Sequence, residues 1–253
     1  MRVTSLHRYP VKGLSPEPLL EVVLVEKAFF PGDRLFALEN GPSAFDPSAP
    51  AYQPKTRFLM LMKNARLAEL VTRFDEASQH LHIARGGVEQ VSGDVRTPEG
   101  RYAIEYFFER FCAGETRGRV RLLAAPDNFR FTDSIRSGFV SILNLASLRD
   151  LEHRLGAPLD PLRFRANIAV DGWEAWQEEG MVGRRLAIGD AELRVLKTID
   201  RCPATHVDLL TGHRDLGIMG ALQSAFGRIS CGIYLSVKRG GRIAPGDCVR
   251  LID

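Results

Sequence analysis

Short runs in the N-terminal third alternate apolar and polar positions, which is the pattern of half-buried β-strands. The predicted strands cover residues 3–7, 20–25, 35–38 and 81–83. Gly-Asp pairs stand directly before three strand-like runs, at Gly32-Asp33, Gly189-Asp190 and Gly246-Asp247. Because Gly accepts a positive φ angle and Asp can hydrogen-bond its own backbone, we expect tight turns at these places.

Two segments carry the longer period of amphipathic helices. In residues 102–112 the apolar side chains recur at intervals of four, at Ala103, Phe107 and Phe111, which predicts one buried face. Residues 147–155 begin with a serine, a favoured N-cap, repeat leucine on one face and end before a glycine. The C-terminal part of the chain then returns to short strand-like runs, as in a barrel or sandwich. The predicted fold class is therefore β-rich mixed α/β, with a few helices.

A change of composition predicts the domain boundary. In residues 86–100, Gly, Ser, Asp and Pro replace the apolar periodicity, and a helix follows. We therefore expect one unit over residues 1–100 and a second over 101–253. The Gly- and Pro-rich residues 40–54 form an exposed connection inside the first unit.

The charge balance excludes some classes of partner. The 253 residues hold 34 Lys and Arg against 31 Asp and Glu, a formal net charge of +3. Nucleic-acid binding needs a much stronger basic footprint, so we expect no nucleic-acid partner. The longest apolar run is far shorter than a membrane span, and the first residues lack the apolar core of a signal peptide. We expect a cytoplasmic protein that acts on a small molecule, with no membrane partner.

One of the four cysteines stands where chemistry is expected. The cysteines form no C-x-x-C pair, which argues against structural zinc and iron–sulfur sites. Cys202 follows the strand-like run 192–199 and precedes Pro203, so it lies where a strand must stop. Nearby cationic groups favour the thiolate, the form that binds soft metals or attacks electrophiles. A functional thiol and an ordinary loop cysteine both remain open.

The other three cysteines, Cys112, Cys231 and Cys248, lie in or beside apolar segments and are expected in the core.

Two other segments offer groups that could bind a ligand. Lys12 stands in the turn sequence Tyr-Pro-Val-Lys-Gly, where Pro and Gly fix the backbone and the ammonium can contact a phosphate. Further along, strand alternation sends Arg165 and Asn167 to the same face. The simpler alternatives are that Lys12 is a solvated turn residue and that Arg165 and Asn167 belong to a salt-bridged strand edge.

Taken together, the chain resembles the MOSC family, which includes the C-terminal domain of molybdenum cofactor sulfurases and the amidoxime-reducing molybdenum enzymes. The segments that carry the resemblance are, in order, YPVKG, GDRLFAL, ASLRDL, FRANIAV, IGDAELRVLK, RCPATHVDLLTG and GIYLSV. The run Arg-Cys-x-x-Thr-x-Val-Asp-x-x-Thr-Gly is the most specific of them. The resemblance implies an N-terminal β-barrel-like domain over 1–100 and a MOSC β-barrel domain over 101–253.

The resemblance also implies a cofactor and its site. The cofactor is molybdenum-molybdopterin, with Cys202 as the metal ligand and catalytic residue. The residues that hold it are Lys12, Arg34, Arg165 and Asn167, and Arg201 can face it as well.

The implied activity is reduction of N-hydroxylated substrates. Electrons come from a separate partner, such as a ferredoxin, a cytochrome b5-like protein or a flavin reductase, because these residues show no iron–sulfur cysteine pattern. Where amidoxime reducers have Thr-Asp-Ala-Ser, this chain has Asn144-Leu145-Ala146-Ser147, without the acid, near the expected pocket. His206 either donates a proton or is packed away, and we do not count it as catalytic.

Two alternatives belong to other functional classes. In the first, Cys202 holds the cofactor or a persulfide for delivery to another protein and turns nothing over. In the second, Cys202 works without a cofactor beside His206 or His213, for which the sequence offers only proximity.

Overall fold

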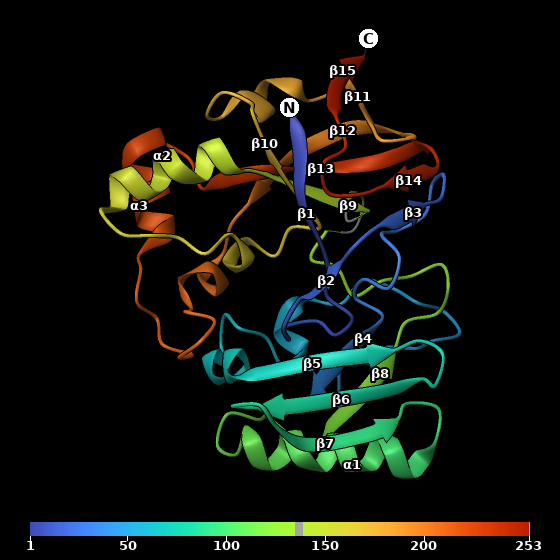
Figure 1. Ribbon diagram of the computed structural model, residues 1–253. Helices are drawn as coiled ribbons and strands as arrows, with labels where there is room; N and C mark the ends of the chain where they lie inside the picture. Colours follow the sequence, from blue (N-terminus) through green and yellow to red (C-terminus); the bar gives the residue numbers. More distant parts are fainter. Residues whose placement is uncertain (135–138, 253) are drawn as a thin grey trace.

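The computed structural model describes residues 1–134 and 139–252 (Figure 1). Its strands are β1 (Arg2–Arg8), β2 (Glu17–Leu19), β3 (Val22–Leu24), β4 (Phe36–Asn40), β5 (Leu70–Asp75), β6 (His80–Arg85), β7 (Val88–Asp94), β8 (Val120–Ala124), β9 (Val140–Asn144), β10 (Ile168–Asp171), β11 (Arg185–Ile188), β12 (Ala191–Asp200), β13 (Ser230–Arg239), β14 (Gly241–Ile243) and β15 (Val249–Ile252). Its helices are α1 (Pro98–Phe111), α2 (Leu145–Leu155) and α3 (Ile218–Phe226), with short 3₁₀ helices η1 (Lys55–Arg57), η2 (Ala65–Glu69), η3 (Pro161–Phe164), η4 (Gln177–Met181) and η5 (Pro203–His206).

The largest sheet has the strand order β15-β11-β12-β13-β9-β10-β1-β2. Only β9 and β10 pair in parallel among its strands. The sheet curls back on itself, because the Val3 N–H donates to Asp247 O (2.9 Å) and the Val249 N–H donates to Met1 O (3.0 Å). The apolar side chains of its strands, including Leu6, fill the inside of this curl as one buried cluster.

The lower part of Figure 1 is a second strand-rich unit. The sheet β5-β6-β7 lies there beside the pair β4-β8, and α1 packs against β7 and β8. Thr97 caps α1 by accepting a hydrogen bond from the Gly100 N–H (3.1 Å), so the helix begins four residues before the predicted start. Its buried face holds Ile104 and Phe108, one position away from the predicted Phe107 stripe, which is only partly buried. The prediction of the helix is confirmed. Phe107 and Phe111 pack against the same core as Ile104 and Phe108, so the predicted buried face is confirmed in part.

The turn and cap signals of the sequence are confirmed at several places. Gly32, Gly189 and Gly246 all adopt positive φ angles, of 70°, 53° and 93°. Gly189-Asp190 is the two-residue turn between β11 and β12. The helix α2 begins two residues before its predicted start, because Asn144 caps it, and ends at Gly156 with φ 67°.

Strands from the N-terminal and C-terminal parts of the chain pair with each other in the same sheets. The first strand, β1, belongs to the large sheet, whereas α1 and β8 pack with the N-terminal strands. The predicted β-rich mixed α/β fold class is confirmed, and the division at residue 100 stays a prediction. No helix among residues 1–134 and 139–252 is both long and apolar enough to cross a bilayer.

Two helical glycines give a matched test of the packing between α1 and β7. A Cβ at Gly100 would lie 2.3 Å from Asp94 O, whereas one at Gly220 in α3 would meet nothing within 4 Å. We expect Gly100→Ala to destabilise the protein by about 1–3 kcal/mol through overpacking. Gly220→Ala should stabilise it by about 0.5–1 kcal/mol, because alanine restricts the unfolded chain. Urea unfolding measures both, and equal effects would contradict the close approach of α1 and β7.

Candidate functional site

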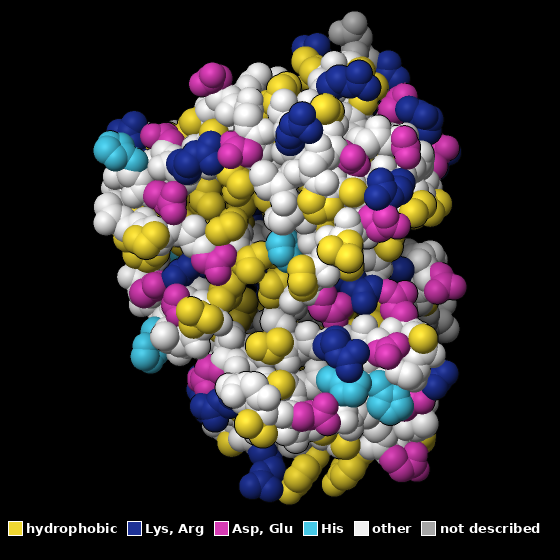
Figure 2. All heavy atoms as spheres, viewed as in Figure 1, with side chains coloured by type: hydrophobic (Ala, Val, Ile, Leu, Met, Phe, Trp, Pro, Cys, Tyr) yellow, Lys and Arg dark blue, Asp and Glu magenta, His cyan; other side chains and the backbone are white. Residues whose placement is uncertain are grey.

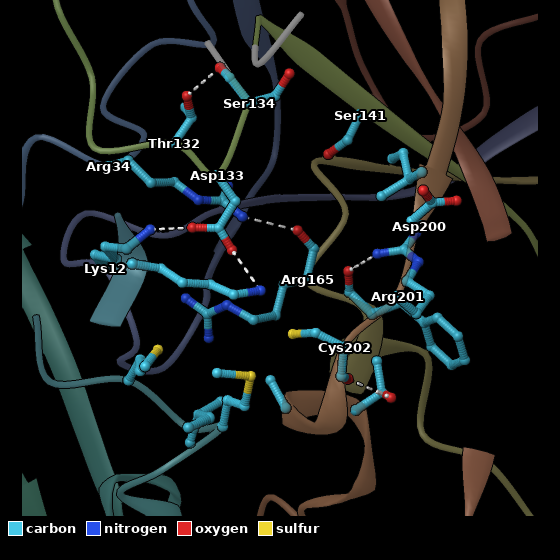
Figure 3. A pocket seen from close by; sticks show the side chains of 18 of the residues that line it. Lys12, Arg34, Thr132, Asp133, Ser134, Ser141, Arg165, Asp200, Arg201 and Cys202 are labelled. Atoms are coloured by element: carbon cyan, nitrogen blue, oxygen red, sulfur yellow. Dashed lines mark hydrogen bonds and ion pairs between the residues drawn. The ribbon is translucent and has the colours of Figure 1, made fainter. Parts of the chain in front are cut away.

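A cavity of about 460 Å³ lies between the large sheet and the N-terminal unit (Figure 3). All six residues singled out in the sequence line it: Lys12, Arg34, Arg165, Asn167, Arg201 and Cys202. Figure 2 shows hydrophobic side chains gathered across the middle of one face, between the upper and lower parts, with charges of both signs elsewhere. The structure thus brings segments far apart in the sequence to one place, and the roles of these residues stay predictions.

Cys202 occupies the junction between β12 and η5, as the strand-end pattern suggested. Its carbonyl accepts hydrogen bonds from the Thr205 N–H (3.1 Å) and from Thr205 Oγ1 (3.0 Å), which fixes the turn. Its half-buried thiol points into the cavity in Figure 3. Burial raises the pKa of both Cys112 and Cys231 to about 12, as suits core cysteines. Cys248 is exposed, so the prediction that it lies in the core is wrong.

Lys12 is buried instead of solvated. Its ammonium donates to Phe131 O (3.1 Å) and forms an ion pair with Asp133. Burial lowers the pKa of Lys12, and Asp133 opposes this shift. For Asp133, burial acts to raise the pKa, but the Lys12 ammonium lowers it on balance and keeps the carboxylate ionised.

Arg34 and Arg165 share an uncommon backbone conformation. Their φ angles are 50° and 53°, in the left-handed region that non-glycine residues rarely adopt and that recurs at functional sites. Arg34 pairs with Asp33 (2.5 Å) and donates to Arg165 O (3.0 Å). Arg165 donates through Nη1 to Leu14 O (2.6 Å), but its buried Nη2 has no partner. Burial and the nearby Arg34 lower the pKa of Arg165 to about 10.

Asn167 and Arg201 line the wall but use their polar groups on the protein itself. The Asn167 side-chain oxygen accepts from Ser141 N–H (3.1 Å) and Ser141 Oγ (2.9 Å). Arg201 donates through Nε to Cys231 O (2.7 Å) and through Nη1 to Phe164 O (2.7 Å). Both residues therefore brace the strands beneath the cavity.

Lys55 and Asp133 are among the cavity residues that the sequence analysis did not single out. The Lys55 ammonium lies 3.9 Å from an Asp133 oxygen and faces Cys202. Burial lowers the pKa of Lys55, but Cys202 and Asp133 outweigh it and raise the pKa on balance. Lys55 directly follows the segment interpreted as an exposed connection, and Asp133 stands in no recognisable pattern, so no sequence signal indicated either.

The Asn144–Ser147 segment, expected near the pocket, is not among the residues that line the cavity. Asn144 Nδ2 donates to Glu178 (2.7 Å), and Ser147 Oγ donates to the same buried carboxyl group (2.8 Å). Burial raises the pKa of Glu178. These residues therefore hold α2 against η4.

A buried arginine fixes the loop that follows Cys202. The Arg163 guanidinium binds Asp215 at 2.6 and 2.7 Å and Asp208 at 3.0 Å. Asp208 also accepts hydrogen bonds from the Thr211 N–H and hydroxyl, both at 2.8 Å. Asp208 and Thr211, which belong to the most specific motif, therefore close this loop.

His206 caps a helix. Its Nε2 accepts a hydrogen bond from the Met219 N–H (3.2 Å) in the first turn of α3, which requires an unprotonated nitrogen. Of the two open interpretations, the structure supports the packed one.

The composition of the cavity fits an anionic ligand that brings its own metal ligands. The described basic residues that line it are Lys12, Arg34, Lys55, Arg163, Arg165, Lys197 and Arg201, against the acids Asp33, Asp133 and Asp200. The unpaired Arg165 Nη2 lacks an acceptor that a phosphate oxygen would supply. Within the described part of the chain, no three His, Cys, Asp or Glu residues could together hold a metal ion. A metal at Cys202 therefore needs further ligands from a bound group, as a pterin dithiolene provides.

Comparison with known proteins supports the resemblance. The MOSC domain family model matches residues 136–250. The resemblance stated from the motifs is therefore confirmed for this part of the chain.

Three relatives share the same kind of name. Mitochondrial amidoxime-reducing component 1 of Homo sapiens is 38% identical over 89 residues, which is 34% of this chain and 26% of that protein. Mitochondrial amidoxime reducing component 2 of Rattus norvegicus is 32% identical over 130 residues, 45% of this chain and 37% of that protein. Component 1 of Mus musculus is 30% identical over 139 residues, 49% of this chain and 40% of that protein. The chain thus matches less than half the length of each.

Two solved structures resemble the fold more distantly. The YuaD protein from Bacillus subtilis is 15% identical with a TM-score of 0.49, over 98% of this chain and 93% of that one. YiiM from Geobacillus stearothermophilus is 22% identical with a TM-score of 0.36, over 46% of this chain and 54% of that one.

The helix cap made by His206 predicts a pH dependence of stability. Burial, and then the neighbouring Arg214, lower the pKa of His206 in the folded state below the ordinary histidine value of 6.5. A depressed folded pKa means that the contribution is present above pH 6.5 and is lost as the pH falls through the folded pKa.

We expect His206→Gln, which keeps an acceptor, to lose less stability than the wild type between about pH 7.5 and 5.5. Because His206 is partly exposed, we expect the melting temperatures of the two proteins to diverge by about 1–2 °C over this range. The exposed His213 caps no helix, so His213→Gln serves as the control and should follow the wild type. Parallel curves for all three proteins would exclude the cap.

Proposed function

We propose that this protein is an oxidoreductase that binds molybdenum-molybdopterin and removes oxygen from N-hydroxylated substrates. The observation that carries the proposal is the unpaired, buried Arg165 Nη2 in a cation-rich cavity that also contains the Cys202 thiol. The MOSC domain and the names of the matched relatives support the same class of cofactor and reaction.

The basic side chains would hold the cofactor. Lys12, Arg34 and Arg165 converge on one part of the cavity, where an ammonium and two guanidinium groups can bind phosphate oxygens. Cys202 supplies a soft thiolate ligand for the metal, and Arg201 braces the backbone next to it. When bound, such a cofactor supplies a two-electron centre that takes up an oxygen atom.

The remaining polar groups would manage charge and protons around the substrate. In the reaction the N–O bond breaks, a separate redox protein supplies two electrons, and two protons complete the water and the N–H group. Lys55 faces the cavity beside Cys202, so its ammonium can donate a hydrogen bond to the departing oxygen. Asp133, held ionised by Lys12, keeps the Lys55 ammonium in place through the weaker 3.9 Å contact.

The proposal predicts that Cys202→Ala abolishes turnover without unfolding the protein. We expect the rate per bound molybdenum to fall by at least about 100-fold, because a ligand to the reacting centre is lost. Cys248→Ala removes an exposed thiol and should change neither activity nor melting temperature. Cys231→Ala should cost about 1 kcal/mol of stability through lost packing and leave turnover per metal unchanged.

The measurement uses protein from a cofactor-competent host, a chemical electron donor and benzamidoxime, with molybdenum and released pterin determined in the same samples. Undiminished turnover in Cys202→Ala would remove this residue from the mechanism. Wild-type protein with full zinc and no pterin would refute the proposal. Protein that holds molybdenum and pterin but never takes up electrons in a substrate-dependent way would be a carrier of the cofactor.

A further inference from the structure

Tyr9 is a fully buried aromatic residue whose ring contacts both Arg34 and Arg165. It directly follows β1, and its exposed fraction is 0%. The guanidinium carbon of Arg34 lies 4.6 Å from the centroid of its ring, and that of Arg165 lies 4.3 Å from the same centroid. Both distances fall within the range of a cation–π interaction.

The backbone of Tyr9 is fixed to the turn that carries Arg34. The Tyr9 N–H donates to Asp33 Oδ1 (2.8 Å), and the Tyr9 carbonyl accepts from the Arg34 N–H (2.7 Å). The phenol makes only a long contact of 3.5 Å with Ala166 O. Burial raises the pKa of Tyr9 to about 12, so the phenol is neutral near pH 7. The ring face, and not the hydroxyl group, is therefore what Tyr9 offers its two neighbours.

The positive charges of Arg34 and Arg165 repel each other, and Asp33 forms an ion pair with Arg34. A second carboxylate would relieve the repulsion, but it would also occupy the N–H donors and cancel the charge. An aromatic ring stabilises a guanidinium through its face and leaves the N–H groups at the edge free. Arg165 fits this description, because its buried Nη2 has no hydrogen-bond partner.

We propose that Tyr9 is a positioning residue whose ring holds Arg34 and Arg165 side by side as a receptor for an anionic phosphate group. The ring offsets the loss of hydration of both cations while their unused N–H groups face the ligand. The left-handed φ angles of both arginines show that the fold keeps them in place at a cost in backbone strain. The identity of the natural ligand rests on the proposed function, whereas the phosphate site itself does not require turnover.

Inorganic phosphate is the probe, titrated calorimetrically at fixed ionic strength into protein from a host that lacks the cofactor. Tyr9→Phe keeps the ring and should leave the dissociation constant within about twofold of the wild type. Tyr9→Leu removes the ring and should raise the dissociation constant by about 10-fold. Leu6→Ala is the control for general destabilisation, because Leu6 is a buried residue of β1 in the core of the large sheet. This variant should leave phosphate affinity unchanged.

A second series tests the ring without changing its shape. Phenylalanine analogues with increasing numbers of ring fluorines, incorporated at position 9, weaken the negative face, so phosphate affinity should fall steadily along the series. Equal affinity across the series, or a loss in Tyr9→Phe as large as in Tyr9→Leu, would overturn the role of the ring. Wild-type protein that binds no phosphate would overturn the receptor itself. Phosphate binding as expected without any reductase activity would refute only the proposed function.

Discussion

Lys12, Arg34 and Arg165 carry three positive charges that are largely removed from water, and the arrangement of the site depends on how these charges are stabilised. Lys12 and Arg34 each have one carboxylate neighbour, Asp133 and Asp33, whereas Arg165 has backbone carbonyl contact and an unpaired nitrogen. Buried charge is unfavourable unless it is paired and hydrogen-bonded, so an arrangement of this kind is stable when an anion completes it. A phosphate-bearing cofactor satisfies that requirement, and the thiol in the same cavity indicates which atom would face a soft metal.

The fold explains why such distant groups can meet. Lys12 follows β1, Arg34 precedes β4, Arg165 follows η3 and Cys202 follows β12, so each stands near one end of a regular element. Hydrogen bonds between residues 1–3 and 246–249 curl the large sheet, which fixes β1 relative to β12. The second core includes Leu59 and Leu61, which follow Lys55 closely in the chain, and Leu61 also lines the cavity. Two cores therefore support one cavity, and neither contains it alone.

Local patterns predicted several of the strands, the turns with positive φ and the position of Cys202, because these depend on neighbours in the sequence. The strands β5 and β7 were not predicted, and β7 lies in the segment 86–100 that was interpreted as a boundary. Patterns failed where partners are remote. Lys55 and Asp133 gave no signal, since their proximity to the thiol is created by packing between units. The exposed Cys248 was assigned to the core from its apolar neighbours, and the most buried positions of α1 are Ile104 and Phe108, beside the predicted Phe107 and Phe111. The family resemblance supplied the cofactor, which no periodicity encodes.

The proposed function places one ligand between the cations of the cavity and the Cys202 sulfur. X-ray absorption spectroscopy at the molybdenum edge can detect this arrangement in wild-type and Cys202→Ala protein from a cofactor-competent host. We expect one sulfur fewer around the metal in the variant, with pterin still bound through Lys12, Arg34 and Arg165. Identical sulfur shells in the two proteins would contradict it.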